Sequence, residues 1–163
     1  DELDLGEADP LNAGHVPAGA SKVHVLTLRL RRVLEADINH ILSKHSDLSV
    51  PEWRILSVLS RSETVMSQKE VVKQIVIAQG QASRALFSLQ TAGLVLASQS
   101  KADRRSWNYM ISVKGRAVFD AILPHMEERR SALDDGLSRK ELLAFERITT
   151  KIARAAQARQ NNS

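Results

Sequence analysis

Cysteine is absent from the 163 residues of this chain. Its absence excludes disulfides, thiolate catalysis, thiol redox sensing and Cys-based zinc sites. A cytoplasmic protein is the simplest expectation for such a chain. No hydrophobic run approaches the roughly 18 apolar residues of a membrane-spanning helix, so we expect no membrane partner. The N-terminal residues also lack the charged-then-apolar pattern of a signal peptide.

Aromatic residues are scarce as well, at 4% of the chain. Apolar residues as a whole reach 43%, which is enough for a hydrophobic core built mainly from Leu, Ile, Val and Ala. Such a composition favours helices over a β-sandwich. The length fits one domain, or one domain with an oligomerising extension.

Basic residues are missing from the first twenty positions, which contain five acidic residues and no Lys or Arg. The formal net charge of the chain is +4, so residues 21–163 carry a larger positive excess than the whole chain does. The positive charge of residues 21–163 suggests a polyanionic partner, and nucleic acid is the first candidate. Residues 1–20 show no hydrophobic period, and we expect a flexible acidic tail there.

Apolar residues then recur at steps of three and four, which predicts a long amphipathic helix from about residue 21 to His45. Ser-x-x-Glu pairs at 49–52, 67–70 and 138–141 predict three further helix starts. Alternating apolar residues around 94–100 and 106–112 predict a β-hairpin. Ser112 is expected to cap another helix, in which Pro124 predicts a kink or a break near Leu123.

The stretch QASRALFSLQTAGLV, residues 81–95, is unusual because Arg84 is the only charged residue between Gln74 and Ser100. Helical spacing turns Ala82, Leu86 and Leu89 inward. The other side then carries Gln81, Arg84 and Ser88, flanked by Gly80 and Ser83. Such a neutral polar face suits the donors and acceptors of base edges, whereas a row of lysines would bind every sequence alike. The alternative is a soluble helix that happens to have small polar residues.

Four segments together resemble the MarR family of bacterial transcriptional regulators, over about residues 21–160. They are LSVPEWRILSVL, SQKEVVKQIVIAQGQASRALFSLQTAGLV, ADRR and ISVKGRAVF. The resemblance implies a mainly α fold with a small β-hairpin, a winged helix-turn-helix flanked by long dimerisation helices. We therefore expect a flexible acidic tail in 1–20, a DNA-binding domain in 47–112, and a helical dimerisation region in 21–46 and 113–163.

Two positions depart from the family pattern. Val76 stands where many relatives have a turn glycine, and Ala78 where many have an Asp that caps the recognition helix. We expect the start of this helix to depend on the side chain of Gln79 or Gln81 instead. The departures affect the first helical turn and leave the predicted fold unchanged.

The predicted partner is double-stranded DNA. A lysine in the first turn of a helix can bind a phosphate together with the N-terminus of that helix. The resemblance implies that an arginine of the wing enters the minor groove, because the negative potential of that groove attracts it. Asp103 is interpreted as a buttress that pairs with a neighbouring Arg. The alternative for the wing is an ordinary solvated loop. The predicted DNA-binding residues are Ser67, Gln68, Lys69, Gln79, Gln81, Ser83, Arg84, Ser88, Lys101, Asp103, Arg104 and Arg105.

The family resemblance also implies a small aromatic or phenolic acid as an effector, bound in a crevice beside the winged domain. The candidates there are His24, Trp53 and Arg54. Trp53 also fits the core, because it starts an apolar series at helical spacing, and His24 also fits a solvent-facing position. His40 and His45 are five residues apart and do not converge on a helix, so we expect no metal and no cofactor.

The function expected from these features is a ligand-responsive repressor that binds a near-palindromic operator as a homodimer. Two other classes of function compete with this one. An enzyme is disfavoured because the sequence shows no nucleophile–base pair, phosphate-binding glycine loop or metal spacing. A winged-helix module that binds protein rather than DNA remains the alternative, and the positive wing is the feature that argues against it.

Overall fold

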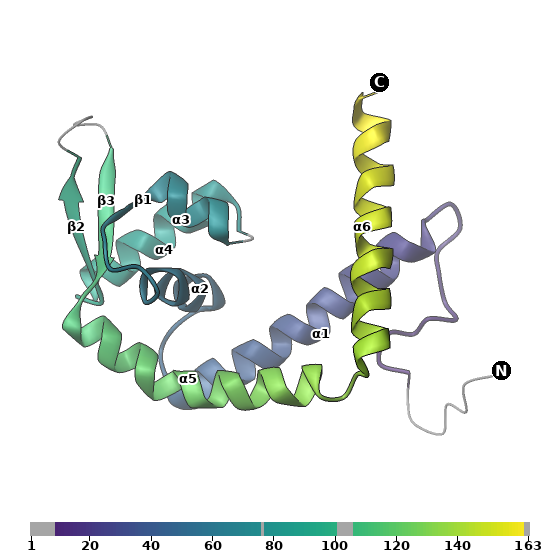
Figure 1. Cartoon of the computed structure of the whole chain (residues 1–163), viewed down its shortest axis with the longest axis horizontal. Helices are drawn as coiled ribbons and strands as arrows, with labels where there is room; N and C mark the ends of the chain where they lie inside the picture. Colours follow the sequence, from purple (N-terminus) through teal and green to yellow (C-terminus); the bar gives the residue numbers. More distant parts are fainter. Residues whose placement is uncertain (1–8, 76, 101–105, 162–163) are drawn as a thin grey trace. The chain divides into compact units, whose positions relative to one another are not determined.

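The computed structural model describes residues 9–75, 77–100 and 106–161, and these form six helices and three short strands (Figure 1). The order along the chain confirms the predicted sequence of helices with a hairpin between the fourth and fifth. The elements are α1 (Lys22–His45), α2 (Val50–Leu59), β1 (Met66–Ser67), α3 (Gln68–Gln74), α4 (Gln79–Thr91), β2 (Val95–Gln99), β3 (Trp107–Ile111), α5 (Val113–Asp134) and α6 (Arg139–Asn161). No helix in these ranges is long and apolar enough to cross a membrane.

The predicted Ser-x-x-Glu helix starts are confirmed for α2, α3 and α6. In α3 the carboxylate of Glu70 accepts hydrogen bonds from the backbone N–H and the hydroxyl of Ser67, both at 2.7 Å. These hydrogen bonds lower the pKa of Glu70. Ser49 with Glu52, and Ser138 with Glu141, repeat the arrangement. Each pair satisfies backbone groups that the first helical turn leaves without partners.

The three strands form one antiparallel sheet in the order β1-β3-β2. β2 and β3 are the predicted hairpin, with Val95 opposite Ile111 and Gln99 opposite Trp107. The sequence did not reveal β1, whose two residues pair with Tyr109 and Asn108 of β3. A strand of two residues has no alternation of its own, so only its pairing with β3 defines it. The fold is a winged helix-turn-helix between long helices, as predicted.

The hydrophobic core lies between α1, α2, α4, β2 and the first half of α5. Trp53 is only 8% exposed and its ring stacks on Phe119, with centroids 5.0 Å apart. The interpretation of Trp53 as a core residue is therefore confirmed. Gly115 lets α5 begin against β2, because a Cβ at this position would overlap the carbonyl oxygen of Leu94.

The helix α5 continues through Pro124, so the break expected near Leu123 does not occur. A proline removes one backbone hydrogen bond of a helix but leaves the bonds on either side in place. Phe119 and Ile122 anchor the preceding turns in the core.

The chain divides into two compact units, residues 1–122 and 123–163, with the boundary one residue before this proline.

Residues 9–20 form turns that are attached to α1. The guanidinium of Arg29 donates hydrogen bonds from Nη1 to the backbone carbonyls of Leu11, Asn12 and His15, at 2.7–3.1 Å. Asp9 accepts from the backbone N–H groups of Leu11 and Ala13. This half of the expected tail therefore has defined contacts, and residues 1–8 lie outside the described ranges.

Candidate nucleic-acid interface

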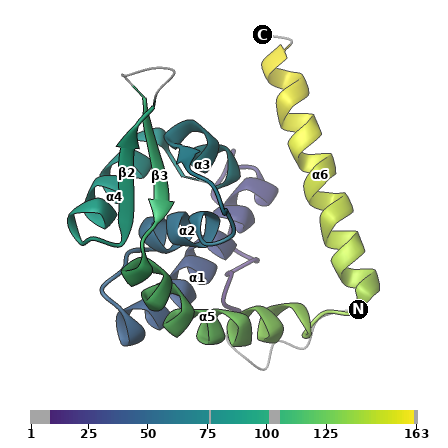
Figure 2. The same cartoon turned by 60° about the vertical axis from the view of Figure 1, so that its left-hand side comes forward.

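The helix α4 is amphipathic and packs its apolar side on α2 (Figure 2). Ala82, Leu86 and Leu89 are at most 1% exposed, as the helical spacing predicted. Ala78 is the N-cap residue and makes no side-chain cap hydrogen bond, so the expected role of Gln79 or Gln81 at the start of this helix stays a prediction. The helix ends at Thr91, and Gly93 follows its C-cap with a φ of 72°, which allows the N–H of Leu94 to return to the carbonyl of Leu89. Tertiary packing of one face holds α4 in place of a cap.

The opposite side of α4 is open to solvent. Gln81, Ser83, Arg84 and Ser88 are all exposed, as a contact surface requires. At about 100° per residue, Arg84 lies directly opposite the buried side, whereas Gln81 and Ser88 lie along the edge toward α2. The predicted polar face therefore exists, with Arg84 near its centre. Gln79 begins the helix, and its side chain lies outside the described part.

Ser88 is engaged with α2 through Glu52. Burial raises the pKa of Glu52, but hydrogen bonds from the hydroxyls of Ser49 and Ser88 outweigh it, so the pKa lies below its ordinary value. Glu52 is thus an anion at neutral pH. A serine hydroxyl has one proton, and when Ser88 donates it to Glu52 only the oxygen lone pairs remain for another group. At this edge of α4, Ser88 would accept hydrogen bonds from a partner.

The start of α3 supplies further polar groups. The hydroxyl of Ser67 caps the helix by donating to Glu70 and accepting from its backbone N–H. Lys69 is exposed and Gln68 is half-buried. Because Ser67 is committed to the cap, Lys69 is the side chain of this turn best suited to a phosphate.

The hairpin that would form the wing is closed by the N–H of Ser100, which donates to the carbonyl of Ser106 at 2.9 Å. Trp107, at the first position of β3, is 44% exposed. The predicted wing contacts Lys101, Asp103, Arg104 and Arg105 lie outside the described residues.

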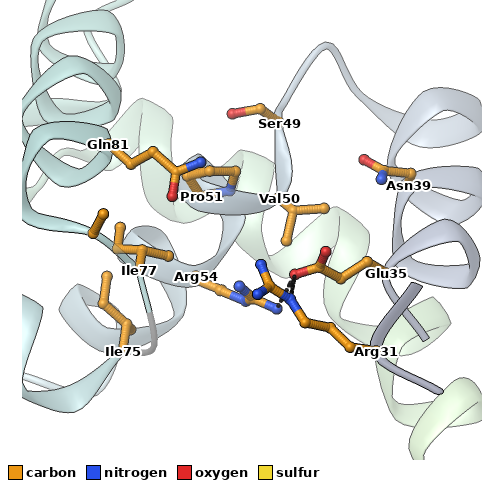
Figure 3. Close-up of a pocket in the computed structure, with 11 residues that line it drawn as sticks. Arg31, Glu35, Asn39, Ser49, Val50, Pro51, Arg54, Ile75, Ile77 and Gln81 are labelled. Carbon is orange, nitrogen blue, oxygen red and sulfur yellow. Dashed lines mark hydrogen bonds and ion pairs between the residues drawn. The ribbon is translucent and has the colours of Figure 1, made fainter. Parts of the chain in front are cut away.

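A cavity of about 680 Å³ lies between α1, α2 and the segment that leads into α4 (Figure 3). The carboxylate of Glu35 accepts hydrogen bonds from Arg31 at 3.2 Å and from Arg54 at 3.5 Å, so two guanidinium groups meet one carboxylate. Gln81 of α4 also lines the cavity. The apolar part of the lining is Val50, Pro51, Ile75, Ile77 and Ala78.

Of the three residues suggested for an effector site, the structure places only Arg54 in this cavity. Trp53 is buried in the core, and His24 is exposed near the start of α1. Sequence analysis missed Arg31 and Glu35. Their spacing of four residues on a helix was visible, but such a pair is normally a solvated surface feature. Only the packing of α1 on α2 brings it to Arg54.

A family model described as the MarR family matches residues 46–106, from the end of α1 to the wing. The transcriptional regulator FarR of Neisseria gonorrhoeae, named as an HTH-type regulator, is 22% identical over 138 residues, which cover 85% of this chain and 93% of FarR. A MarR family regulator from Silicibacter pomeroyi has a similar crystal structure, with 28% identity, a TM-score of 0.63, and coverage of 80% of this chain and 86% of that one.

Two further proteins with a similar fold have been crystallised in complexes, one with DNA and one with a small molecule. Sco3205 of Streptomyces coelicolor, a MarR family transcriptional regulator solved in complex with DNA, has 19% identity and a TM-score of 0.73 over 87% of this chain and 94% of its own. NadR, solved with 4-hydroxyphenylacetate, has 19% identity and a TM-score of 0.65 over 85% and 97%. The fold and the exposed α4 define a winged helix-turn-helix transcriptional regulator. Residues 46–106 match the MarR family model, and the chain over most of its length is similar to a MarR family regulator.

Proposed function

We propose that this chain binds double-stranded DNA in a sequence-specific way, as a homodimeric repressor in the bacterial cytoplasm. The observation that carries the proposal is the exposed face of α4, where Arg84 is surrounded by uncharged hydrogen-bonding side chains. Such groups match base edges in the major groove. The DNA complex of Sco3205 supports the same use of this fold. Lys69 at α3 and the wing segment 101–105 would hold the phosphates.

A binding module for protein is the second candidate. The charge of the chain favours DNA over that role, because the first twenty positions hold five acidic residues and no Lys or Arg, which leaves an excess of basic residues in 21–163. An enzymatic role has no support in the cavity, whose ionisable groups are two arginines and one glutamate paired with one another. The chain is proposed to act by binding alone.

The dimer would form through residues 21–46 and 113–163. In α1, Val23, Leu28 and Val33 are 43–51% exposed. In α6, Leu142, Phe145 and Ile148 share one side of the helix and are 38–54% exposed. Large apolar side chains in such number on long helices are best explained by a second copy of the chain, which would bury them.

Light scattering at micromolar concentration should give twice the 18.1 kDa mass of one chain. Phe145→Glu should shift the measured mass toward that of one chain, because the glutamate would place a charge in the proposed dimer interface. Thr150→Glu, which adds the same charge on the other side of α6, should leave the dimer intact. A mass of 18.1 kDa for the unaltered chain would contradict the homodimer.

The cavity is proposed to bind a small aromatic or phenolic acid. A ligand carboxylate could replace Glu35 as the partner of Arg54 and Arg31, while Ile75 and Ile77 would contact an aromatic ring. NadR, which binds 4-hydroxyphenylacetate, offers a probe of this chemistry. Because Gln81 belongs both to the lining and to α4, a ligand there would displace the first turn of the proposed reading helix. DNA release would follow from that displacement.

Arg54→Ala should weaken binding of 4-hydroxyphenylacetate about 10- to 100-fold, the loss expected for a hydrogen bond to a charged group. DNA affinity without the acid should stay within about twofold, because Arg54 lies on α2 and away from the exposed face of α4. His24→Ala is the matched control, since His24 does not line the cavity. Titration calorimetry measures the first effect, and equal acid affinity in Arg54→Ala and the unaltered chain would contradict the site.

A further inference from the structure

Phe87 is exposed in the middle of α4. Its side chain is 71% exposed, the highest value for any aromatic residue in the described part of the chain. The other large apolar residues of this helix, Leu86 and Leu89, are buried. Helical spacing puts Phe87 on the side opposite the core, one turn after Arg84. The sequence analysis assigned Phe87 to no site, because helical spacing alone gives no reason for an aromatic ring on the exposed side.

Gly80 marks the beginning of the same row. The residues Gly80, Arg84 and Phe87 follow one another at steps of four and three, so they form one stripe along the exposed side. A Cβ at position 80 would meet nothing within 4 Å, and the backbone there needs no positive φ. Gly80 is the second residue of α4, where alanine is the better helix former. No contact among the described residues accounts for this glycine, whereas close approach of an outside partner would.

The surroundings of Phe87 favour DNA over an apolar protein surface. Its exposed neighbours on α4 are Ser83, Arg84, Gln90 and Thr91, all of which are polar. A protein-docking patch would need contiguous apolar side chains. In the major groove, by contrast, every thymine presents a methyl group beside hydrogen-bonding base atoms, and apolar side chains contact that methyl. One apolar group within a polar stripe matches this pattern.

We propose that Phe87 is a specificity-determining residue that contacts the C5-methyl group of a thymine in each half-site. Arg84, one turn earlier, would face a neighbouring base, and Gly80 would let the start of α4 approach the DNA backbone. This inference rests on the proposed DNA-binding function. It adds a base identity, thymine, that hydrogen bonding alone would not select.

Deoxyuridine tests the contact because it differs from thymine only by lacking that methyl group. A preferred duplex is first selected from a random pool, and each thymine is then replaced in turn, symmetrically in both half-sites. At one symmetric position the unaltered protein should bind about 15-fold more weakly, which is about fourfold per methyl or ~0.8 kcal/mol each. Phe87→Ala should bind the thymine duplex more weakly and be indifferent to the replacement. Ser83→Ala, a matched exposed position, should keep the full deoxyuridine penalty.

Gly80→Ala provides a second variant with a different signature. Its thermal stability should equal or exceed that of the unaltered chain, because alanine is the better helix former and the space is open. Its affinity for preferred and scrambled DNA should nevertheless fall at least about tenfold, because the added methyl meets the DNA backbone. Unchanged affinity would overturn the role of Gly80.

The outcomes separate this inference from the proposed function. The Phe87 contact is overturned if the unaltered protein selects a duplex but binds it equally well with deoxyuridine at every position, or if the selected half-sites lack thymine. Sequence-specific DNA binding is then still supported. The same holds if Phe87→Ala keeps the deoxyuridine penalty. If the unaltered protein prefers no duplex over a scrambled one, both proposals are overturned.

Discussion

Raising monovalent salt from about 50 to about 200 mM should weaken binding of the dimer to its preferred duplex at least about 150-fold. The phosphate-binding groups proposed for each protomer are Lys69, Lys101, Arg104 and Arg105. Each phosphate that is neutralised releases a condensed counterion, and the logarithm of affinity falls by about 0.9 per contact for each decade of salt. Even if only half of these groups in a dimer touch phosphate, the slope is about −4.

The salt experiment has a direct internal control. Lys101→Ala should reduce the slope by about one for each protomer, on preferred and scrambled duplexes alike. Lys151→Ala, which removes the same charge from α6, should leave the slope unchanged. Fluorescence anisotropy at four salt concentrations measures all three proteins. A flat dependence for the unaltered chain would mean that these charges do not face phosphates.

The second large effect concerns Arg84. We expect Arg84 to contact a base edge, whereas the lysines contact only DNA phosphates. Arg84→Ala should lose about 10- to 100-fold affinity on the preferred duplex, the discrimination typical of one bidentate base contact. Scrambled duplexes should be affected much less. The structure places Arg84 opposite the buried side of α4, whereas Gln81 lies at the edge beside the cavity. We therefore expect Gln81→Ala to have the same sign and a smaller size.

Arg84→Lys separates charge from geometry. The lysine keeps the positive charge but loses the planar pair of donors that a base edge requires. It should lose most of the affinity for the preferred duplex and keep the affinity for scrambled DNA, whereas Lys101→Ala should lower both by similar factors. If Arg84→Lys instead bound the preferred duplex as tightly as the unaltered chain, Arg84 would be a phosphate contact and α4 would need another reader.

Local chemistry made the helices and the buried face of α4 predictable from sequence. A Ser-x-x-Glu pair such as Ser67 with Glu70 satisfies its own helix start, so the signal and the structure lie within four residues. The inward positions Ala82, Leu86 and Leu89 follow from one helical period. Gly93 ends α4 because its positive φ is expensive for other residues.

Features that depend on tertiary contact were missed or mistaken. The strand β1 exists only because Met66 and Ser67 pair with β3. The cavity needs α1 packed on α2 before Arg31 and Glu35 meet Arg54. Of the kink or break expected near Leu123, the break does not occur, because α5 continues through Pro124. Phe87 was assigned to no site, since periodicity places it on the exposed side without giving a reason for an aromatic ring there.

Selection of bound DNA from a random pool tests the central claim most directly. The proposed dimer of winged helices predicts an enriched near-palindrome whose half-sites lie about one helical turn, roughly 10 base pairs, apart. The selection is run at moderate salt, where binding through phosphates alone is weak. An enriched pool that binds no better than the starting pool at the same salt would contradict sequence-specific recognition by α4.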